Sequence, residues 1–311
     1  MRVLITDHIH PWLAARLERE GVVVDVLPDS TNEDVKTIIH EYNGLIVSTK
    51  TLVNAALIDA ATQLQFIARV GSGMEHIDVS YARSKGIEVY HSASGNANAV
   101  AEHAVGLLLA LVRKIPKAVS EVQEGRWIRE ENRGIELSGR KIGIIGFGNT
   151  GERFARRLSG FGMEILVYDK YRKDITVPHV KVTDLATIQR EAEIISFHVP
   201  LTAETTFYLD AAFIDSMNHP FYLLNTSRGK VVKTSDLCLG LQSGKVKGAA
   251  LDVLENERLD TFSPEEQNWW QNLQANADKV IITPHIAGWT HESKLKMVQL
   301  IYNQVEPLLL L

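Results

Sequence analysis

Short apolar segments alternate with amphipathic segments along most of the chain. In its first third, apolar and β-branched runs are separated by patterns with helical periodicity. The runs lie at residues 3–5, 22–26, 44–47, 65–68 and 87–89, and the helical patterns include residues 11–20 and 33–41. Alternation of this kind predicts a parallel sheet that helices cover.

A second alternating series begins at residue 141. It predicts about six strands, at residues 141–145, 164–168, 194–197, 221–225, 248–251 and 280–283. Between the two series, the pattern over residues 99–119 predicts one long helix. Because its first half is apolar nearly all round, we expect it to lie in a core or in a subunit contact. Residues 291–309 predict a last helix that returns to the first domain. The predicted domains are residues 1–95 with 289–311, and residues 96–288 inserted between them.

Composition narrows the class of protein. The chain has 311 residues, with 33 basic and 38 acidic side chains and a net charge of −5, so it lacks the basic excess of a nucleic-acid-binding platform. Cys238 is the only cysteine, which excludes an intramolecular disulfide and fits a reducing cytoplasm. The first residues turn polar too soon for a signal peptide, and the longest apolar stretch, residues 104–112, is too short to span a membrane. We therefore expect a soluble cytoplasmic protein.

A glycine-rich segment follows the first strand of the second series. It has the pattern G-x-G-x-x-G and reads Gly146-Phe147-Gly148-Asn149-Thr150-Gly151. Such glycines form a tight turn, let the backbone approach a pyrophosphate, and let the next helix pack closely. Asp169 lies 23 residues after the first glycine, at the end of the next strand, where a carboxylate binds the ribose hydroxyls and favours NAD over NADP. The simpler alternatives are that the glycines only form a tight turn and that Asp169 is only a turn residue at a strand end. The positive charges of Lys170 and Arg172 nearby could weaken the preference for NAD.

Several further blocks carry a family resemblance, and with the glycines they cover residues 40 to 295 in order. They are Arg69-Val70-Gly71-Ser72-Gly73, His198-Val199-Pro200, Asn225-Thr226-Ser227-Arg228-Gly229, Ala250-Leu251-Asp252-Val253 and Thr283-Pro284-His285-Ile286. The chain resembles the D-isomer-specific 2-hydroxyacid dehydrogenases, in a short, phosphoglycerate dehydrogenase-like form without the regulatory domain. The resemblance implies an α/β fold of two Rossmann-like domains: a flavodoxin-like substrate domain and an inserted NAD-binding domain with a doubly wound parallel sheet. It also implies a homodimer.

The resemblance implies roles for individual residues. Arg228 matches the arginine that holds the substrate's carboxylate, and His285 matches the general acid/base. Glu257 matches the carboxylate that pairs with this histidine, although an apparent insertion before His285 leaves Glu255 as an alternative partner. Taken alone, Arg228 could be a solvated arginine and His285 a buried core histidine.

The remaining expected contacts form two sets, and no metal ion is expected. The cofactor set comprises Gly146, Phe147, Gly148, Asn149, Thr150, Gly151, Asp169, His198, Val199, Pro200, Thr226, Asp252 and Gly288. The substrate set comprises Lys50, Val70, Gly71, Ser72, Gly73, Asn96 and Trp289.

Departures from the family pattern bear on the substrate, which we expect to be a small 2-oxo or 2-hydroxy acid. Overall resemblance favours D-3-phosphoglycerate, with glycerate/hydroxypyruvate or glyoxylate as alternatives. Ser48 stands where phosphate-binding members often have arginine, so only Lys50 could meet a phosphate there, and Trp289 could narrow the pocket. Formate dehydrogenases resemble this family but pair their histidine with glutamine, so Glu257 argues against that alternative. An NAD-sensing binding module is the alternative of another class, and we expect neither a nucleic-acid nor a membrane partner.

Overall fold

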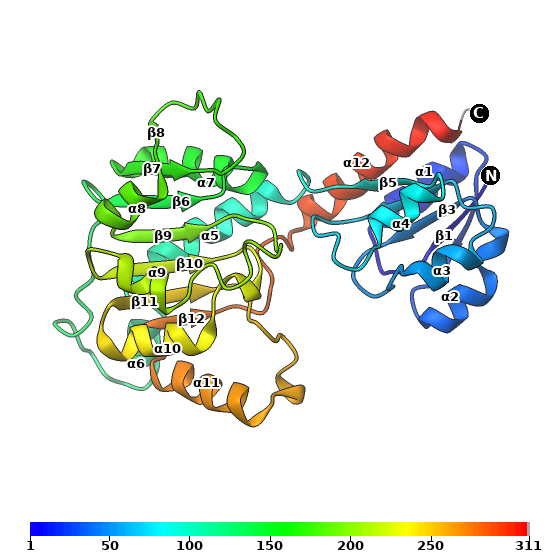
Figure 1. The fold of residues 1–311 in the computed structure, drawn as a ribbon. Coiled ribbons are helices and arrows are strands. Elements are labelled where there is room, and N and C mark those ends of the chain that lie inside the picture. The colour runs from blue at the N-terminus through cyan, green and yellow to red at the C-terminus, as the bar shows by residue number, and fades with distance from the viewer. Residues whose placement is uncertain (310–311) are drawn as a thin grey trace. The chain divides into compact units, whose positions relative to one another are not determined.

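The computed structural model describes residues 1–309 and divides the chain into two compact units. The first unit consists of Met1–Ala97 and the chain from Trp289 onward, and the second is Asn98–Gly288. Each unit is a parallel sheet with helices on its faces (Figure 1). The predicted α/β class is confirmed.

The first unit has a five-stranded sheet in the order β2-β1-β3-β4-β5. This is the flavodoxin-like strand order. The strands are β1 Arg2–Ile5, β2 Val23–Val26, β3 Gly44–Val47, β4 Phe66–Arg69 and β5 Glu88–His91, and the helices are α1 Trp12–Arg19, α2 Asn32–Ile38, α3 Ala55–Ala60, α4 Val79–Ser84 and α12 His291–Leu309. As expected, the last helix packs on this unit: the Tyr302 ring meets Trp12 edge-on, with the ring centroids 5.7 Å apart.

The second unit has a seven-stranded sheet in the order β12-β11-β10-β9-β6-β7-β8. The strands are β6 Lys141–Ile145, β7 Glu164–Tyr168, β8 Val180–Val182, β9 Ile194–Phe197, β10 Phe221–Asn225, β11 Val246–Leu251 and β12 Val280–Ile282. The helices are α5 Ala97–Val112, α6 Ile115–Gln123, α7 Asn149–Leu158, α8 Leu185–Glu191, α9 Ala211–Ser216, α10 Thr234–Ser243 and α11 Pro264–Ala275. The strand order reverses between β6 and β9, as in a doubly wound dinucleotide-binding fold. The edge strand β8 was not predicted, because it has only three residues and none of them is buried.

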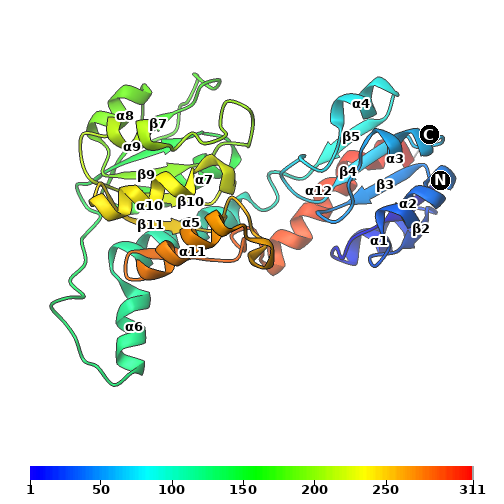
Figure 2. The ribbon, with the colours of Figure 1, turned by 60° about the horizontal axis from the view of Figure 1, so that its bottom comes forward.

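The single helix predicted over residues 99–119 is wrong. The chain forms α5 and α6 instead, and between them Lys114 takes a left-handed conformation with φ 54°. Pro116 explains the break, because proline cannot continue a helix but is well placed in the first turn of a new one. Figure 2 shows α6 and the chain that follows it extending away from the sheet of the second unit. Among residues 1–309, no helix combines the length and apolarity needed to cross a membrane.

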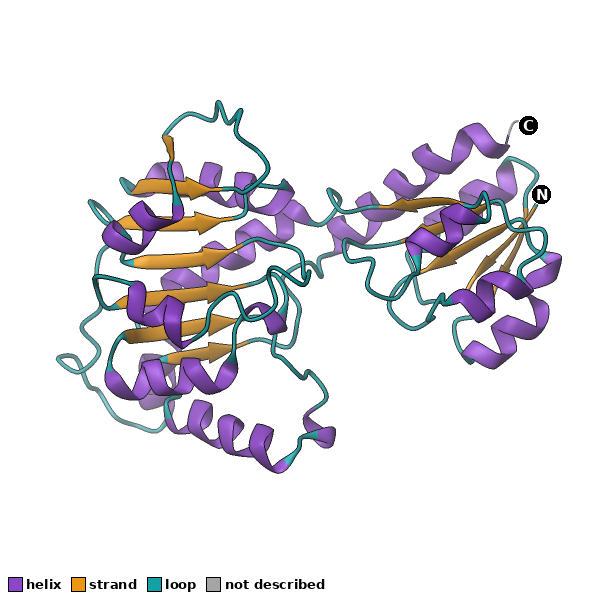
Figure 3. Ribbon diagram, in the orientation of Figure 1, coloured by secondary structure: helices purple, strands orange, loops and turns teal. Residues whose placement is uncertain are grey.

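All strands of the second unit run in the same direction, so their carboxyl ends lie at one edge of the sheet (Figure 3). The loops that follow β6, β7, β9, β10, β11 and β12 leave the sheet at this edge. In open α/β sheets, ligands bind outside this edge where the strand order reverses. The expected cofactor and catalytic residues of the second unit lie on these loops or directly after them.

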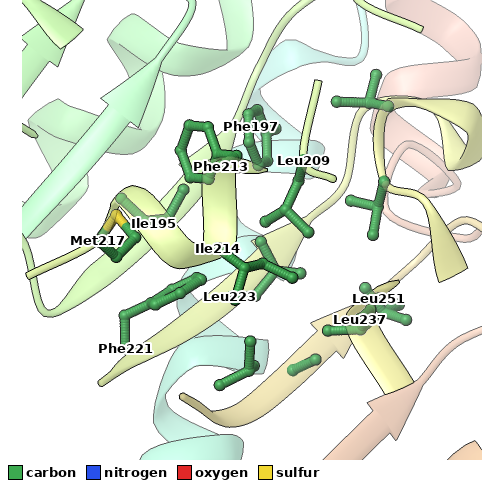
Figure 4. Close-up of a cluster of buried hydrophobic side chains, with 14 of the residues drawn as sticks. Ile195, Phe197, Leu209, Phe213, Ile214, Met217, Phe221, Leu223, Leu237 and Leu251 are labelled. Atoms are coloured by element: carbon green, nitrogen blue, oxygen red, sulfur yellow. The ribbon is translucent and has the colours of Figure 1, made fainter. Parts of the chain in front are cut away.

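A hydrophobic core makes the second sheet a firm support for these loops. On one face, side chains from β9, β10 and β11 pack against α9 and α10 (Figure 4). Phe197 and Phe213 are both buried, with ring centroids 5.9 Å apart. A well-packed core holds the strand ends in place, so the loops that follow them start from fixed positions.

Candidate active site and cofactor site

The glycine loop has the geometry that a pyrophosphate requires. Gly146 has φ +91°, and a Cβ there would lie 2.6 Å from the carbonyl oxygen of His198. A Cβ on Gly151 would lie 2.3 Å from the carbonyl oxygen of Gly146. By contrast, a Cβ on Gly148 would meet nothing within 4 Å, and Gly148 caps the amino terminus of α7. Two glycines are thus needed for packing, and the third leaves open space where a phosphate can approach helix amides.

Asp169 connects this loop to the turn after β7. Its carboxylate accepts hydrogen bonds from the backbone N–H groups of Phe147 at 2.7 Å, Tyr171 at 2.9 Å and Arg172 at 2.8 Å. Burial alone would raise the pKa of Asp169, but these three amides outweigh it and lower the pKa. The group is therefore ionised, and Oδ2, which accepts only the Phe147 amide among these three, has a further lone pair with which to accept a ribose hydroxyl. The ribose contact itself stays a prediction.

His198 contacts the start of α7, next to the glycine loop. Its ring is buried, 2.9 Å from Ser196 Oγ through Nε2 and 3.3 Å from Thr150 Oγ1 through Nδ1. Burial lowers the pKa of His198 to about 3, so the imidazole is neutral. Its side chain thus fixes the start of α7, and a direct contact of His198 with cofactor stays a prediction.

Thr226 provides an independent sign of a ligand. It directly follows β10 and is 8% exposed, and its Oγ1 is buried without a hydrogen-bond partner within residues 1–309. Buried hydroxyls are normally paired, because an unpaired one costs roughly 1–3 kcal/mol. The orphaned hydroxyl and the glycine cradle both fit a bound dinucleotide at this edge.

Arg228 is placed by a turn that only a few residues can form. Asn225 is fully buried; it accepts hydrogen bonds from the N–H and hydroxyl of Ser227 and donates one to the carbonyl of Arg228 at 2.9 Å. A Cβ on Gly229 would lie 1.7 Å from the carbonyl oxygen of Leu254, so glycine is required there. The Arg228 guanidinium donates to the carbonyl of Ser227 at 2.7 Å and is half-buried.

His285 is paired with Glu257. Its Nδ1 lies 2.8 Å from Glu257 Oε2, whereas Glu255 accepts a hydrogen bond from the backbone N–H of Thr234. The contact partner of the histidine is therefore Glu257. His285 also has φ 55°, a left-handed conformation that is uncommon for residues other than glycine and is typical of functional sites.

Asp252 holds the loop that carries His285. It is 1% exposed and accepts hydrogen bonds from Thr283 Oγ1 at 2.6 Å and from the N–H groups of Ile286 and Ala287 at 2.9 and 2.8 Å. His103 Nε2, on α5, lies 3.1 Å from the same threonine hydroxyl. Burial would raise the pKa of Asp252, but its hydrogen bonds lower it, first the one from His103 Nε2 at 3.5 Å and then those from Thr283, Ala287 and Ile286, so the carboxylate is ionised. Its expected contact with cofactor stays a prediction; what the structure shows is a positioning role.

The pKa of His285 is raised. The hydrogen bond to Glu257 is the main cause, burial acts against it, and the negative charges of Glu257 and Asp252 raise it further. The positive charge of Arg228 acts in the opposite direction and lowers it. A histidine with a raised pKa keeps more of its proton at neutral pH, as a proton donor needs.

In the first unit, the predicted substrate loop follows β4. Gly71 has φ +153°, a conformation that strains any other residue, and a Cβ there would also displace the guanidinium of Arg69, 1.1 Å away. The Gly71 N–H donates to Ser92 Oγ at 2.9 Å, and Ser72 Oγ donates to Asn96 Oδ1 at 3.1 Å. The predicted substrate residues from Val70 to Gly73 are thus tied to the loop after β5.

Lys50 is engaged within the first unit. The buried carboxylate of Asp7 accepts hydrogen bonds from the backbone N–H groups of residues 48–50, the shortest being 2.7 Å from Ser48. The Lys50 ammonium donates to the carbonyl of Pro28 at 2.5 Å, and its charge helps to lower the pKa of Asp34. Its expected phosphate contact stays a prediction.

Trp289, the first residue after the second unit, is 67% exposed, and the ammonium of Lys294 lies 4.5 Å from its ring centroid. Its predicted place beside the substrate stays untested. Three residues of the site were not predicted: Asn225, Thr283 and His103. The first two lie in blocks already recognised, whereas nothing in the sequence connects His103 to a residue so far along the chain.

Comparisons with known proteins agree with this geometry. A profile of the D-isomer specific 2-hydroxyacid dehydrogenase NAD-binding domain matches residues 105–287. Hydroxypyruvate reductase from Thermotoga maritima is 36% identical over 88% of each chain, and glyoxylate reductase from Thermofilum pendens is 36% identical over 96% of this chain and 88% of its own. D-3-phosphoglycerate dehydrogenase from Archaeoglobus fulgidus is 34% identical over 98% of this chain, which spans 56% of that relative's length.

Solved structures extend the likeness to the fold. D-lactate dehydrogenase from Aquifex aeolicus, complexed with NAD and lactic acid, superposes with a TM-score of 0.85 at 27% identity over 99% of this chain and 95% of its own. The chain belongs to the D-isomer-specific 2-hydroxyacid dehydrogenase family, and its predicted resemblance is confirmed. The cofactor is NAD(H), which the glycine loop and the Thr226 hydroxyl fit.

Proposed function

We propose that this protein is an NAD-dependent dehydrogenase that interconverts a short 2-oxo acid and the corresponding D-2-hydroxy acid. The observation that carries the proposal is the His285–Glu257 pair, 2.8 Å apart, with the Arg228 charge acting on the same imidazole. A protonated imidazole and a guanidinium provide what reduction of a keto acid needs: a proton and a site for the carboxylate.

Each residue has a separate task in the proposed reaction. NAD(H), when bound, supplies or accepts the hydride. Arg228 holds the substrate's carboxylate through its planar fork. His285 donates a proton from Nε2 to the keto oxygen, while Glu257 at Nδ1 fixes the ring and stabilises its charged form. Asp252 keeps the His285 loop in place.

The pH dependence of reduction tests the His285–Glu257 pair. Because Glu257 raises the pKa of His285, protonated histidine persists to higher pH in the wild type than it would alone. Glu257→Gln keeps the shape but removes the charge, so the basic limb of the kcat/KM profile for reduction moves to lower pH. Initial rates with NADH across pH 5 to 10 measure this shift. Glu265→Gln, an exposed change on α11, is the matched control, and a profile unaltered by Glu257→Gln would remove the pair from the mechanism.

Among the acids, we propose a small unphosphorylated one, hydroxypyruvate or glyoxylate. One donor of the Lys50 ammonium is taken by the Pro28 carbonyl, and the two 36%-identical relatives are matched over 88% of their length. D-3-phosphoglycerate is the second candidate, supported by the relatives of that name and by Lys50, whose point charge could still bind a phosphate.

Lys50→Ala distinguishes these substrates. If Lys50 makes only its local contacts, the variant alters the KM for phosphohydroxypyruvate and for hydroxypyruvate equally and by less than about twofold, since a surface contact contributes little. Steady-state kinetics with both acids provide the comparison. A rise in KM for the phosphorylated acid alone would instead identify Lys50 as a phosphate ligand.

We further propose a homodimer that forms through α6. Ile115, Val119 and Val122 make an apolar stripe at helical spacing, each between 47% and 52% exposed, and Trp127 beyond the helix is 81% exposed. Large apolar side chains gathered on one exposed face usually mark an interface. Val119→Glu therefore converts the dimer to monomers in light scattering at micromolar concentration, whereas Leu239→Glu on α10 does not. A wild-type protein that is already monomeric would contradict the proposal.

We also propose a reducing, cytoplasmic location. Cys238 is the only cysteine and is buried, and burial raises the pKa of its thiol to about 11. Such a thiol is unreactive, and a single buried cysteine has no intramolecular disulfide to form in an oxidising compartment. Cell fractionation tests this location.

A further inference from the structure

An arginine-rich cavity lies beside the glycine loop of the second unit. It has a volume of about 500 Å³ and is lined by Phe147, Gly148, Asn149, Glu152, Arg153, Arg156 and Arg172. Three guanidinium groups thus face one carboxylate. Two of the lining residues, Phe147 and Arg172, donate their backbone N–H groups to the carboxylate of Asp169, the residue expected to bind the adenosine ribose.

Glu152 binds two of these arginines at once. One carboxylate oxygen accepts hydrogen bonds from Arg156 at 3.0 and 3.2 Å, and the other accepts one from Arg172 at 2.7 Å. The pKa of Glu152 is lowered, with the hydrogen bond from Arg172 as the largest cause, so the group is ionised. Arg172 also donates to the carbonyl of Phe147 at 2.9 Å, which fixes its guanidinium at the rim of the glycine loop.

We propose that Glu152 is a specificity-determining residue that excludes NADP by occupying Arg172 and Arg156. Without this carboxylate, the two guanidinium groups and Arg153 form a site for the 2′-phosphate of NADP. With it, Arg172 and Arg156 already donate hydrogen bonds to a carboxylate, and a phosphate dianion that approaches them meets the negative charge of Glu152. The proposal concerns cofactor choice and does not depend on the substrate or direction of the reaction.

The chemistry of the cavity favours a phosphate over other anions. Guanidinium forks bind phosphate oxygens in pairs, and the amino terminus of α7, where Glu152 stands in the first turn, favours negative charge. The carboxylate of Asp169 also has a structural task, because it holds one backbone amide of the glycine loop and two of the turn after β7. Replacing Asp169 therefore disturbs backbone that both dinucleotides use, whereas the Glu152 carboxylate accepts hydrogen bonds from Arg156 and Arg172, which line the cavity.

Direct binding tests the proposal without any substrate. NADH and NADPH are titrated by fluorescence against the wild type, Glu152→Gln, Glu152→Gln/Arg172→Ala, and the control Glu164→Gln. Glu164 pairs with Lys141 and Lys181 at the start of β7, outside the cavity lining. Glu152→Gln lowers the Kd of NADPH by about tenfold or more and leaves the Kd of NADH within about twofold, as the release of two charge-assisted contacts to a phosphate requires. The added Arg172→Ala cancels this gain, and Glu164→Gln changes neither Kd.

Other outcomes overturn the proposal. Equal tightening for NADH and NADPH would indicate a general charge effect, and an NADPH gain that survives Arg172→Ala would place the phosphate elsewhere. Competition with 2′,5′-ADP, 5′-ADP and inorganic phosphate separates the sources: only the 2′-phosphorylated nucleotide should gain affinity from Glu152→Gln. If inorganic phosphate alone gained, the cavity would be a phosphate site unrelated to the cofactor. Thermal melting verifies folding, and Glu152→Ala serves as a second variant if Glu152→Gln is unstable.

Discussion

His285→Ala lowers turnover by about 10² or more, the usual contribution of a general acid, while the affinity for NADH remains nearly unchanged. The imidazole is the proposed proton donor, and its Nδ1 is bound to Glu257, so removal leaves the keto oxygen without a positioned proton. The cofactor is expected at the glycine loop and Thr226, which this change does not touch. Single-turnover kinetics and NADH titration separate the two effects.

The backbone at residue 285 calls for a second variant. Alanine at φ 55° is strained, whereas asparagine tolerates this conformation, so His285→Asn tests the loss of the imidazole with less distortion. Both variants should lose turnover to a similar extent. His219→Ala, an exposed histidine of the same unit, provides the control and should behave like the wild type. Full turnover in His285→Asn would remove this residue from the mechanism.

Arg228→Lys lowers kcat/KM for the 2-oxo acid by about 10²-fold, although the positive charge is retained. A planar fork can hold a carboxylate through two parallel hydrogen bonds, each worth about 1.5–3 kcal/mol when charged, and an ammonium cannot reproduce this geometry. The turn of Asn225 and Gly229 is unaffected, because the Asn225 amide bonds the carbonyl of residue 228 rather than its side chain.

The split between kinetic constants identifies the role of Arg228. Loss of substrate binding raises the KM for the 2-oxo acid, leaves the Kd of NADH unchanged, and leaves the pH limb assigned to His285 close to its wild-type position. Arg190→Lys, on the exposed surface of α8, is the matched control. A lysine variant with wild-type kcat/KM would show that Arg228 does not hold the carboxylate.

Local patterns were sufficient to predict most of the fold. The strands of both sheets follow from apolar runs, and residues 291–309 form the predicted last helix, because each burial pattern is local. The prediction of a single helix over residues 99–119 failed because the apolar periodicity continues across the break that Pro116 imposes after Lys114. The edge strand β8 was missed because none of its residues is buried, so it has no apolar signal.

The sequence predicted those site residues that lie in recognisable motifs, but not the contacts between distant segments. Arg228 and His285 lie in recognisable blocks, but the choice between Glu257 and Glu255 depends on how the chain folds before α11, which spacing does not reveal. His103 meets Thr283 across the unit because α5 packs near the end of β12, a long-range contact without a sequence signal. The Glu152–Arg172 contact is hidden for the same reason, since the two residues lie on α7 and in the loop after β7.

Oxidation of NADH at neutral pH with a panel of 2-oxo acids tests the central claim most directly. The panel comprises phosphohydroxypyruvate, hydroxypyruvate, glyoxylate, pyruvate and 2-oxoglutarate. The proposed dehydrogenase turns over at least one of these acids, with hydroxypyruvate or glyoxylate preferred, and His285→Asn lowers that turnover by about 10² or more. Tight NADH binding without turnover of any acid would contradict the claim and indicate an NAD-sensing protein instead.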